Sequence, residues 1–244
     1  MDVIRVNHFR KTFEGRTVHA DVTFNVQKGE CVGLVGGSGV GKSVVLRSLI
    51  GLEKPDSGEI WIDGEEISKL SEADLVHIRK KVAYVFQNGA LFDSMSVYEN
   101  LAYPLVEHTN MTSGQIKSAI HEQLEEFGLI EAVDKLPAEL SGGMQKRVGL
   151  ARAMMIKPKV ILYDEPTAGL DPYNTLKIRE TVLRLKKTGV TSLFVTHDMP
   201  TAVAVCDRFC LLGGGKVAAE RSVEDLKTDK TGPLHDFILG EEGG

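Results

Sequence analysis

The chain has 244 residues, of which 42% are hydrophobic and 26% are charged, proportions typical of a globular protein with one sizeable domain. Its formal net charge of −5 argues against a broadly basic surface that binds nucleic acid. We expect no secretory signal, and the sequence lacks the run of about 18 apolar residues that crosses a membrane. Any membrane role should therefore depend on a partner protein.

Short stretches of alternating apolar and polar residues indicate β-strands near the start of the chain. One such stretch, 22–26, ends at a turn formed by Lys28 and Gly29. A second turn at 55–58 precedes another alternating stretch at 59–64. We therefore expect several strands in the N-terminal part of the chain.

A glycine-rich segment between these strands matches the complete P-loop pattern G-x-x-x-x-G-K-[ST]. It follows the apolar run 30–35, a predicted strand, and precedes 44–50, a predicted helix. The glycines let backbone N–H groups approach a phosphate chain, and the helix N-terminus adds a positive dipole end. Lys42 should reach the β- and γ-phosphates, and the Ser43 hydroxyl should bind Mg²⁺. The P-loop consists of Gly36, Gly37, Ser38, Gly39, Val40, Gly41, Lys42 and Ser43.

The middle of the chain is predicted to be helical. The apolar stretch 82–86 is a predicted strand that ends at Gln87. Ser113 is the expected N-cap of an amphipathic helix over 114–127, and a second helix is expected from about 142 to 156. Because no clear strand lies between residues 89 and 157, this block is predicted to be a helical insert.

A second apolar strand, 160–163, ends in the carboxylates of Asp164 and Glu165. In P-loop NTPases such a strand carries an aspartate that holds Mg²⁺, and Asp164 fits that role. Glu165, one residue further on, can face the γ-phosphate and orient or deprotonate the attacking water. Paired with the P-loop, the two acids predict a site for nucleotide hydrolysis.

Two further segments fit the same site but have ordinary explanations as well. Ser141, Gly142 and Gly143 precede a predicted helix whose free N–H groups could bind a phosphate, although Ser141 could simply cap that helix. The predicted strand 191–196 ends at His197, and a lone histidine there is more often structural. With the helix expected over 174–187, the alternation of strands and helices predicts a parallel α/β core.

Three cysteines, Cys31, Cys206 and Cys210, form an odd and sparse set that does not suggest a disulfide framework. Cys206 and Cys210 are four residues apart and could share one helical face. No histidine or cysteine pair completes a metal site with them, so we expect packing roles.

Taken in order, these segments resemble the ATP-binding cassette (ABC) ATPases. The resemblance implies one ABC nucleotide-binding domain over 1–244: an α/β P-loop NTPase with a RecA-like parallel sheet core, an antiparallel β subdomain and a helical insert. The implied division is a core of 1–88 and 158–228, a helical subdomain of 89–157 and a C-terminal tail of 229–244. We expect the last five residues, 240–244, to be frayed.

The resemblance also implies roles for individual residues with ATP and Mg²⁺ as cofactors. Residues 140–144 resemble the family's signature, here called the signature segment, although it ends in Met144 where many relatives have glutamine. The implied catalytic residues are Glu165 as general base, His197 as the switch histidine and Gln87. The implied Mg²⁺ ligands are Ser43, Gln87 and Asp164. The implied nucleotide-binding residues outside the P-loop are Phe13, which stacks on adenine in place of the commoner tyrosine, Ser141, Gly142, Gly143 and Asp171.

The stretch 86–105, together with the signature segment, is similar to the ATPase subunit of Mla-type systems. Those systems work with MCE-domain proteins to move phospholipids between the membranes of Gram-negative bacteria. The similarity implies a peripheral subunit on the cytoplasmic face of the inner membrane that helps to maintain outer-membrane lipid asymmetry. The implied partners are a second copy of the chain in a head-to-tail ATP-sandwich dimer, an integral membrane permease, an MCE-domain protein and a small STAS-type accessory subunit, with no nucleic acid.

Two alternatives remain open at this point. The chain could serve a small-solute ABC importer, or it could be a non-transport ATPase of the cell-division type. DNA-repair relatives carry long coiled-coil insertions and translation relatives carry two cassettes, neither of which is present. The aromatic residues Phe92, Tyr98 and Tyr103 could line a groove for a membrane partner or simply pack the helical insert.

Overall fold

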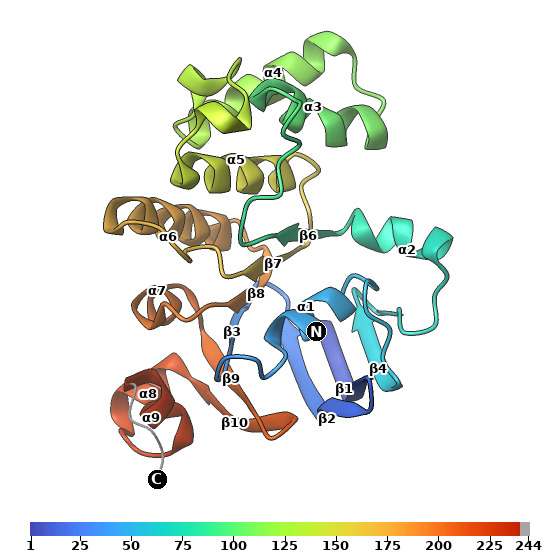
Figure 1. The fold of residues 1–244 in the computed structure, drawn as a ribbon, viewed down its shortest axis with the longest axis vertical. Coiled ribbons are helices and arrows are strands. Elements are labelled where there is room, and N and C mark those ends of the chain that lie inside the picture. Colours follow the sequence, from blue (N-terminus) through green and yellow to red (C-terminus); the bar gives the residue numbers. More distant parts are fainter. Residues whose placement is uncertain (240–244) are drawn as a thin grey trace.

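The computed structural model describes residues 1–239, and ten strands of this part form one sheet (Figure 1). The strand order is β5-β4-β1-β2-β10-β9-β3-β8-β7-β6. The strands are β1 (Asp2–Phe13), β2 (Arg16–Gln27), β3 (Cys31–Val35), β4 (Ser57–Ile62), β5 (Glu65–Glu66), β6 (Val82–Val85), β7 (Val160–Asp164), β8 (Thr191–Val195), β9 (Arg208–Gly213) and β10 (Lys216–Ser222).

The sheet has a parallel part and an antiparallel part. The neighbours β9, β3, β8, β7 and β6 all pair in parallel. β1 pairs antiparallel with β2 and β4, and β4 pairs antiparallel with β5. This arrangement confirms the predicted fold class, the ABC nucleotide-binding domain with a parallel core and an antiparallel subdomain.

Helices cover the sheet and extend from one end of it. In Figure 1 the green helices α3, α4 and α5 lie at one end beyond α6, and β1, β2 and β4 lie on the opposite side of the parallel strands. No helix in residues 1–239 is long and apolar enough to span a bilayer. The helices are α1 (Lys42–Ser48), α2 (Glu72–Arg79), α3 (Val97–His108), α4 (Ser113–Glu126), α5 (Gly142–Met154), α6 (Pro172–Lys187), α7 (Met199–Val205), α8 (Val223–Thr228) and α9 (Pro233–Leu239).

The central strands are buried on both faces, as expected of a parallel sheet under helices. Successive side chains of a strand point to opposite faces, so β7 contributes to two hydrophobic clusters. Ile161 and Tyr163 pack in the cluster with α3 to α7, and Val160 and Leu162 pack with α1, β1, β2 and β4. Because both faces are fixed in this way, the register of β7 is fixed, and with it the position of Asp164 at its end.

Two local predictions were wrong. Helix α4 is capped by Thr112, not Ser113, because the Thr112 side chain accepts from Gln115 N and the Gln115 side chain accepts from Thr112 N in return. Cys206 and Cys210 share no helical face, since Cys206 follows α7 and Cys210 lies in β9.

Other sequence predictions have mixed outcomes. All three cysteines are free and buried, consistent with packing roles. The sequence analysis did not anticipate α2, β9 or β10. The division into a core, a helical subdomain and a tail stays a prediction, and the expected fraying of 240–244 lies outside the described residues.

Helix α5 lies directly against the turn that follows β6. A Cβ atom added at Gly149 would lie 2.6 Å from the Gly89 carbonyl oxygen and 2.9 Å from Gly89 Cα. The guanidinium of Arg152, one turn further along α5, donates to the carbonyl oxygens of Gly89 and Ala90. The close approach therefore requires glycine at position 149 and fixes the turn that carries Gln87.

We expect Gly149→Ala to be less stable than a matched control, Gly114→Ala. The added methyl group meets rigid backbone at position 149, whereas a Cβ at Gly114 on α4 meets nothing within 4 Å. Such overpacking lowers the free energy of unfolding by about 1–3 kcal/mol. Replacing glycine with alanine also raises helix propensity, and the two variants share most of that gain. Urea unfolding of both variants measures the difference, and equal free energies of unfolding would contradict the close packing.

Candidate nucleotide site

The carboxyl ends of four neighbouring parallel strands bring together most of the predicted site residues. The P-loop follows β3, the carboxylates of Asp164 and Glu165 end β7, and His197 follows β8. Gln87 follows β6, which pairs directly with β7. Ligands of open α/β sheets bind at this edge, because the loops that follow parallel strands all emerge there.

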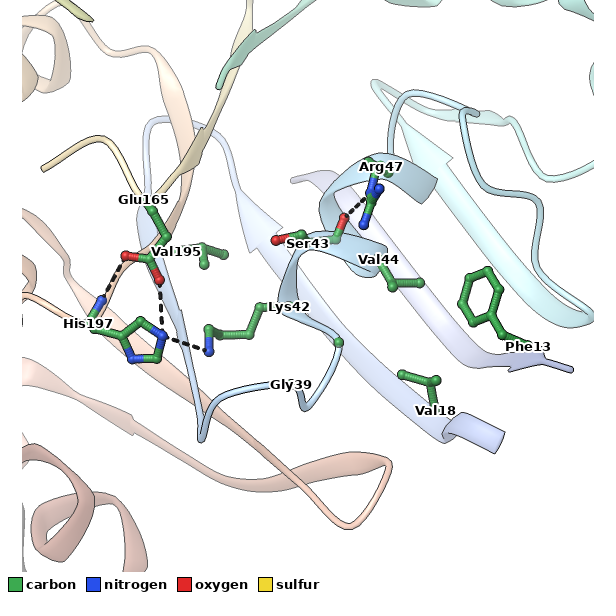
Figure 2. Close-up of a pocket in the computed structure, with 11 residues that line it drawn as sticks. Phe13, Val18, Gly39, Lys42, Ser43, Val44, Arg47, Glu165, Val195 and His197 are labelled. Carbon is green, nitrogen blue, oxygen red and sulfur yellow. Dashed lines mark hydrogen bonds and ion pairs between the residues drawn. The ribbon is translucent and has the colours of Figure 1, made fainter. Parts of the chain in front are cut away.

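A cleft of about 350 Å³ opens between the P-loop and the antiparallel part of the sheet. Figure 2 shows Glu165, His197 and Lys42 on one side of the cleft and Phe13 and Val18 on the other. The structure therefore joins acidic, basic and apolar side chains around one space. The full lining is Phe13, Val18, Gly39, Gly41, Lys42, Ser43, Val44, Arg47, Glu165, Val195 and His197.

Asp164 is the centre of a small hydrogen-bond network. The Ser43 hydroxyl donates to Asp164 Oδ1 at 3.0 Å, and the Tyr84 hydroxyl donates to Asp164 Oδ2 at 2.7 Å. Burial, with the neighbouring Asp164 carboxylate, raises the pKa of Tyr84, so its hydroxyl stays protonated and remains a donor. The sequence analysis missed Tyr84, because its contact with Asp164 depends on the pairing of β6 with β7, which the sequence does not show.

Lys42 is held inside the P-loop. Its Nζ donates to the carbonyl oxygens of Gly36 at 2.8 Å and Gly37 at 3.1 Å, and lies 3.5 Å from His197 Nε2. Burial lowers the pKa of Lys42, and the carboxylates of Glu165 and Asp164 oppose that shift. The ammonium group therefore sits where it can exchange loop carbonyls for phosphate oxygens.

Glu165 is fixed by its backbone and by its neighbour on β8. Its φ of 51° is in the left-handed region, which is uncommon for a residue other than glycine and is typical of functional sites. Its backbone N–H donates to Val195 O at 2.9 Å, and its carboxylate accepts from His197 N at 3.0 Å. His197 Nε2 also lies 3.2 Å from Glu165 Oε1. Figure 2 shows the resulting chain of contacts from Lys42 through His197 to Glu165.

Phe13 stands at the end of β1 on the far side of the cleft. Its side chain is 37% exposed, and Lys11 Nζ lies 5.0 Å from the ring centroid. Ser38, Gly39 and Val40 line an adjoining hollow together with Phe13. An exposed phenyl face at this place can stack on a flat aromatic ligand.

A second group of predicted site residues lies apart from this cleft. Ser141 caps α5 by accepting from Met144 N at 3.3 Å, and Asp171 caps α6 by accepting from Asn174 N at 2.9 Å. A Cβ at Gly143 would lie 2.3 Å from Asn174 Cγ, so the N-terminal ends of the two helices touch. Ser141, Gly142, Gly143, Asp171 and the exposed Gln87 are all absent from the lining of the cleft.

Comparison with known proteins supports an ATP-binding subunit. The family model described as "ABC transporter" matches residues 19–168. A "Methionine import ATP-binding protein MetN" of Carboxydothermus hydrogenoformans is 39% identical over 95% of this chain and 70% of that protein. A "Probable ribonucleotide transport ATP-binding protein mkl" of Mycobacterium tuberculosis is 43% identical over 99% of this chain and 67% of that protein. The "Intermembrane phospholipid transport system ATP-binding protein MlaF" of Escherichia coli is 36% identical over 94% and 86%.

Solved structures agree with this comparison. The ATP-binding cassette MJ0796, dimeric and bound to ADP and Pi, superposes with a TM-score of 0.84 at 32% identity, over 90% of this chain and 98% of that one. CbiO1 of Clostridium perfringens is part of the ABC transporter complex cbiONQ. It superposes with a TM-score of 0.85 at 29% identity, over 94% of this chain and 92% of that one. The chain therefore belongs to the ABC transporter family and is an ATP-binding subunit that hydrolyses ATP.

Proposed function

We propose that two copies of the chain bind two ATP molecules between them, head to tail. The supporting observation is that the signature segment and Asp171 stand outside the cleft that holds the P-loop of their own chain. A second copy can bring its own signature segment to that cleft, where the free N–H groups at the start of α5 would face the γ-phosphate. The dimeric state of the similar cassette MJ0796 supports the same arrangement.

The residues around Asp164 fit a Mg²⁺ ion. The Ser43 hydroxyl and the Asp164 carboxylate lie 3.0 Å apart, and oxygen atoms are the ligands that Mg²⁺ prefers. Gln87 follows the neighbouring strand β6 but does not line the cleft, so its side chain would turn toward Asp164 to complete the ligand set. Bound there, Mg²⁺ would neutralise charge on the β- and γ-phosphates.

Glu165 is the proposed general base. Its carboxylate would accept the proton of a water molecule as the water oxygen bonds to the γ-phosphorus and the bond to the β-phosphate breaks, which releases ADP and phosphate. His197 contacts the Glu165 carboxylate through both its backbone N–H and its ring Nε2, and its ring would also contact the γ-phosphate. Lys42 would bind the β- and γ-phosphates, and Phe13 would stack on adenine.

An apolar groove away from the cleft is the proposed binding surface for a membrane permease. The groove has a volume of about 300 Å³, and the exposed rings of Phe86, Phe92 and Tyr103 line it. The centroids of the Phe92 and Tyr103 rings lie 5.0 Å apart with the rings tilted by 59°, and the Arg152 guanidinium lies 5.4 Å from the Phe92 ring centroid. Tyr98 instead packs against the main hydrophobic cluster, so it is an unsuitable residue with which to test binding.

Tyr84 lies between this groove and the cleft. It lines the groove, its ring lies 4.3 Å from that of Phe86, and its hydroxyl binds Asp164. A bound permease segment that moved Phe86 would thus displace Tyr84, and Tyr84 would transmit the movement to Asp164, the proposed Mg²⁺ ligand. This contact supports a role for the groove in coupling transport to hydrolysis.

We propose phospholipids or related lipids as the cargo, with outer-membrane lipid asymmetry as the purpose. The supporting observations are the Mla-like stretch 86–105 and the similarity to the phospholipid transport protein of Escherichia coli. The proposed partners are then an MCE-domain protein and a small STAS-type subunit, at the cytoplasmic face of the inner membrane. A small-solute importer is the second candidate, since the methionine and ribonucleotide relatives are 39% and 43% identical, against 36% for the phospholipid relative.

Glu165→Gln should bind ATP with near wild-type affinity but hydrolyse it at least about 100-fold more slowly, because the amide cannot accept a proton. We expect this variant to accumulate as an ATP-bound dimer in size-exclusion chromatography. Lys42→Ala is the matched contrast, since it removes a phosphate-facing charge and should weaken binding itself. A Glu165→Gln protein that stays monomeric with ATP and retains the wild-type rate would exclude Glu165 as the base.

Phe92→Asp should detach the chain from its permease while ATP binding persists. The change removes the exposed ring and would bury a carboxylate under the partner beside the Arg152 guanidinium. The lost apolar contact and the desolvated charge together should outweigh a modest interface. Recovery of the permease with a tagged chain from detergent-solubilised membranes measures the effect. The control is Val106→Asp, which changes a 61%-exposed side chain of α3 that does not line the groove.

The cargo is tested in the bacterium that encodes the chain. If phospholipid is moved, deletion should make the cells sensitive to detergent and bile salts, and Phe92→Asp should fail to restore resistance where wild type and Val106→Asp succeed. Full permease recovery with Phe92→Asp would reject the groove as the binding surface. Normal detergent resistance in the deletion strain would instead reject the lipid cargo and favour the small-solute importer.

A further inference from the structure

A fully buried histidine lies directly under the last turn of the P-loop. His19, on β2, is 0% exposed, and its Nε2 lies 3.0 Å from the carbonyl oxygen of Gly41. Gly41 is the N-cap of α1 and has a φ of 97°, which favours glycine. The sequence analysis gave no signal for His19, because the contact depends on where β2 lies relative to the P-loop.

The direction of this hydrogen bond is fixed by the chemistry of the two groups. Burial lowers the pKa of His19, so the ring is neutral near neutral pH and carries one N–H. The Gly41 carbonyl can only accept, which places the proton on Nε2. Nδ1 is then a buried acceptor with no partner among residues 1–239, an arrangement that lowers stability.

The ring is also tightly enclosed. A Cβ at Gly41 would lie 2.4 Å from His19 Nε2 and 2.6 Å from Val18 Cγ1, so the P-loop backbone rests directly on this part of β2. On another side, the ring centroid of Phe9 lies 5.5 Å from that of the imidazole. His19 therefore has little freedom to turn away from the Gly41 carbonyl.

The bond to His19 is not needed to begin helix α1. The Gly41 carbonyl also accepts from Val44 N at 2.9 Å and Val45 N at 3.2 Å, which satisfies this acceptor without the histidine. What the third bond adds is the orientation of one peptide plane. In a planar trans peptide, the Gly41 C=O and the Lys42 N–H point in opposite directions, so fixing the carbonyl also aims that N–H.

We propose that His19 is a positioning residue for ATP binding, which fixes the Gly41–Lys42 peptide so that the Lys42 N–H faces the phosphates. The proposal rests on the proposed role of the P-loop as the ATP site. His19 does not touch the nucleotide. Its effect passes through the backbone of the loop, and Val18 beside it lines the same cleft.

The proposal makes stability and affinity change in opposite directions. His19→Leu removes the unpaired Nδ1 and leaves the Gly41 carbonyl with its two helical donors, so the unliganded protein should be at least as stable as wild type. The same change removes the third bond, which restricts rotation of the peptide plane, so ATP should bind less tightly. A purely structural role would instead lower stability and affinity together.

The experiment compares three variants with wild type. His19→Leu removes the donor, and His19→Gln keeps an amide N–H near the position of Nε2. His19→Asn is the control, because its shorter amide matches Nδ1 and cannot reach Gly41. ATP affinity is measured by calorimetry with Mg²⁺ and a slowly hydrolysed analogue, thermal unfolding is measured without nucleotide, and KM and kcat are measured with ATP.

His19→Leu and His19→Asn should weaken affinity and raise KM by about five- to tenfold, the equivalent of one hydrogen bond. The affinity and KM of His19→Gln should stay within about twofold of wild type. The kcat at saturating ATP should equal the wild-type value in all three variants. Wild-type affinity in His19→Leu would overturn the proposal, as would a loss of affinity that follows a loss of stability without rescue by His19→Gln. If wild type itself bound no ATP, the proposed ATP site would fail first.

Discussion

The hydrogen bonds to Asp164 join parts of the chain that are far apart in sequence. Its two carboxylate oxygens accept from Ser43 and Tyr84, which are 121 and 80 residues away. Those bonds form only because β7 is buried on both faces and ends at a fixed place beside β6 and α1. The P-loop, the proposed base and the groove proposed to bind a permease are therefore arranged around one side chain.

The parts of the site that depend on local sequence were predictable. The P-loop carries its own pattern, and the strand before Asp164 and Glu165 is a continuous apolar run, so both were found without knowledge of the fold. The N-cap of α4 was missed by one residue because Thr112 and Ser113 are both good caps, and only Thr112 has Gln115 three residues later to complete the capping box.

Other contacts could not be read from spacing along the chain. Tyr84 reaches Asp164 because β6 and β7 are neighbours, and His19 reaches Gly41 because β2 passes under α1. Cys206 and Cys210 are four residues apart, which suggested a helix, but α7 ends at Val205 and β9 begins at Arg208. The positions of the strands in the sheet decide the contacts of Tyr84 and His19, and the sequence alone does not specify those positions.

In the proposed dimer, each chain contributes one half to each of two sites. The cleft has the groups proposed to bind phosphate and activate water, and the signature segment presents a capped helix N-terminus that does not line that cleft. The contact of Gly143 with Asn174 fixes the signature segment to the segment that follows Glu165.

Mixing two inactive variants tests the composite site most directly. Ser141→Arg blocks the signature segment and leaves the P-loop intact, whereas Lys42→Ala does the reverse, so each homodimer should hydrolyse almost no ATP. In an equal mixture about half of the dimers contain both variants and one intact site, so about a quarter of the wild-type rate should return. No recovery, in a mixture shown to contain mixed dimers, would contradict the account, as would Ser141→Arg that is fully active alone.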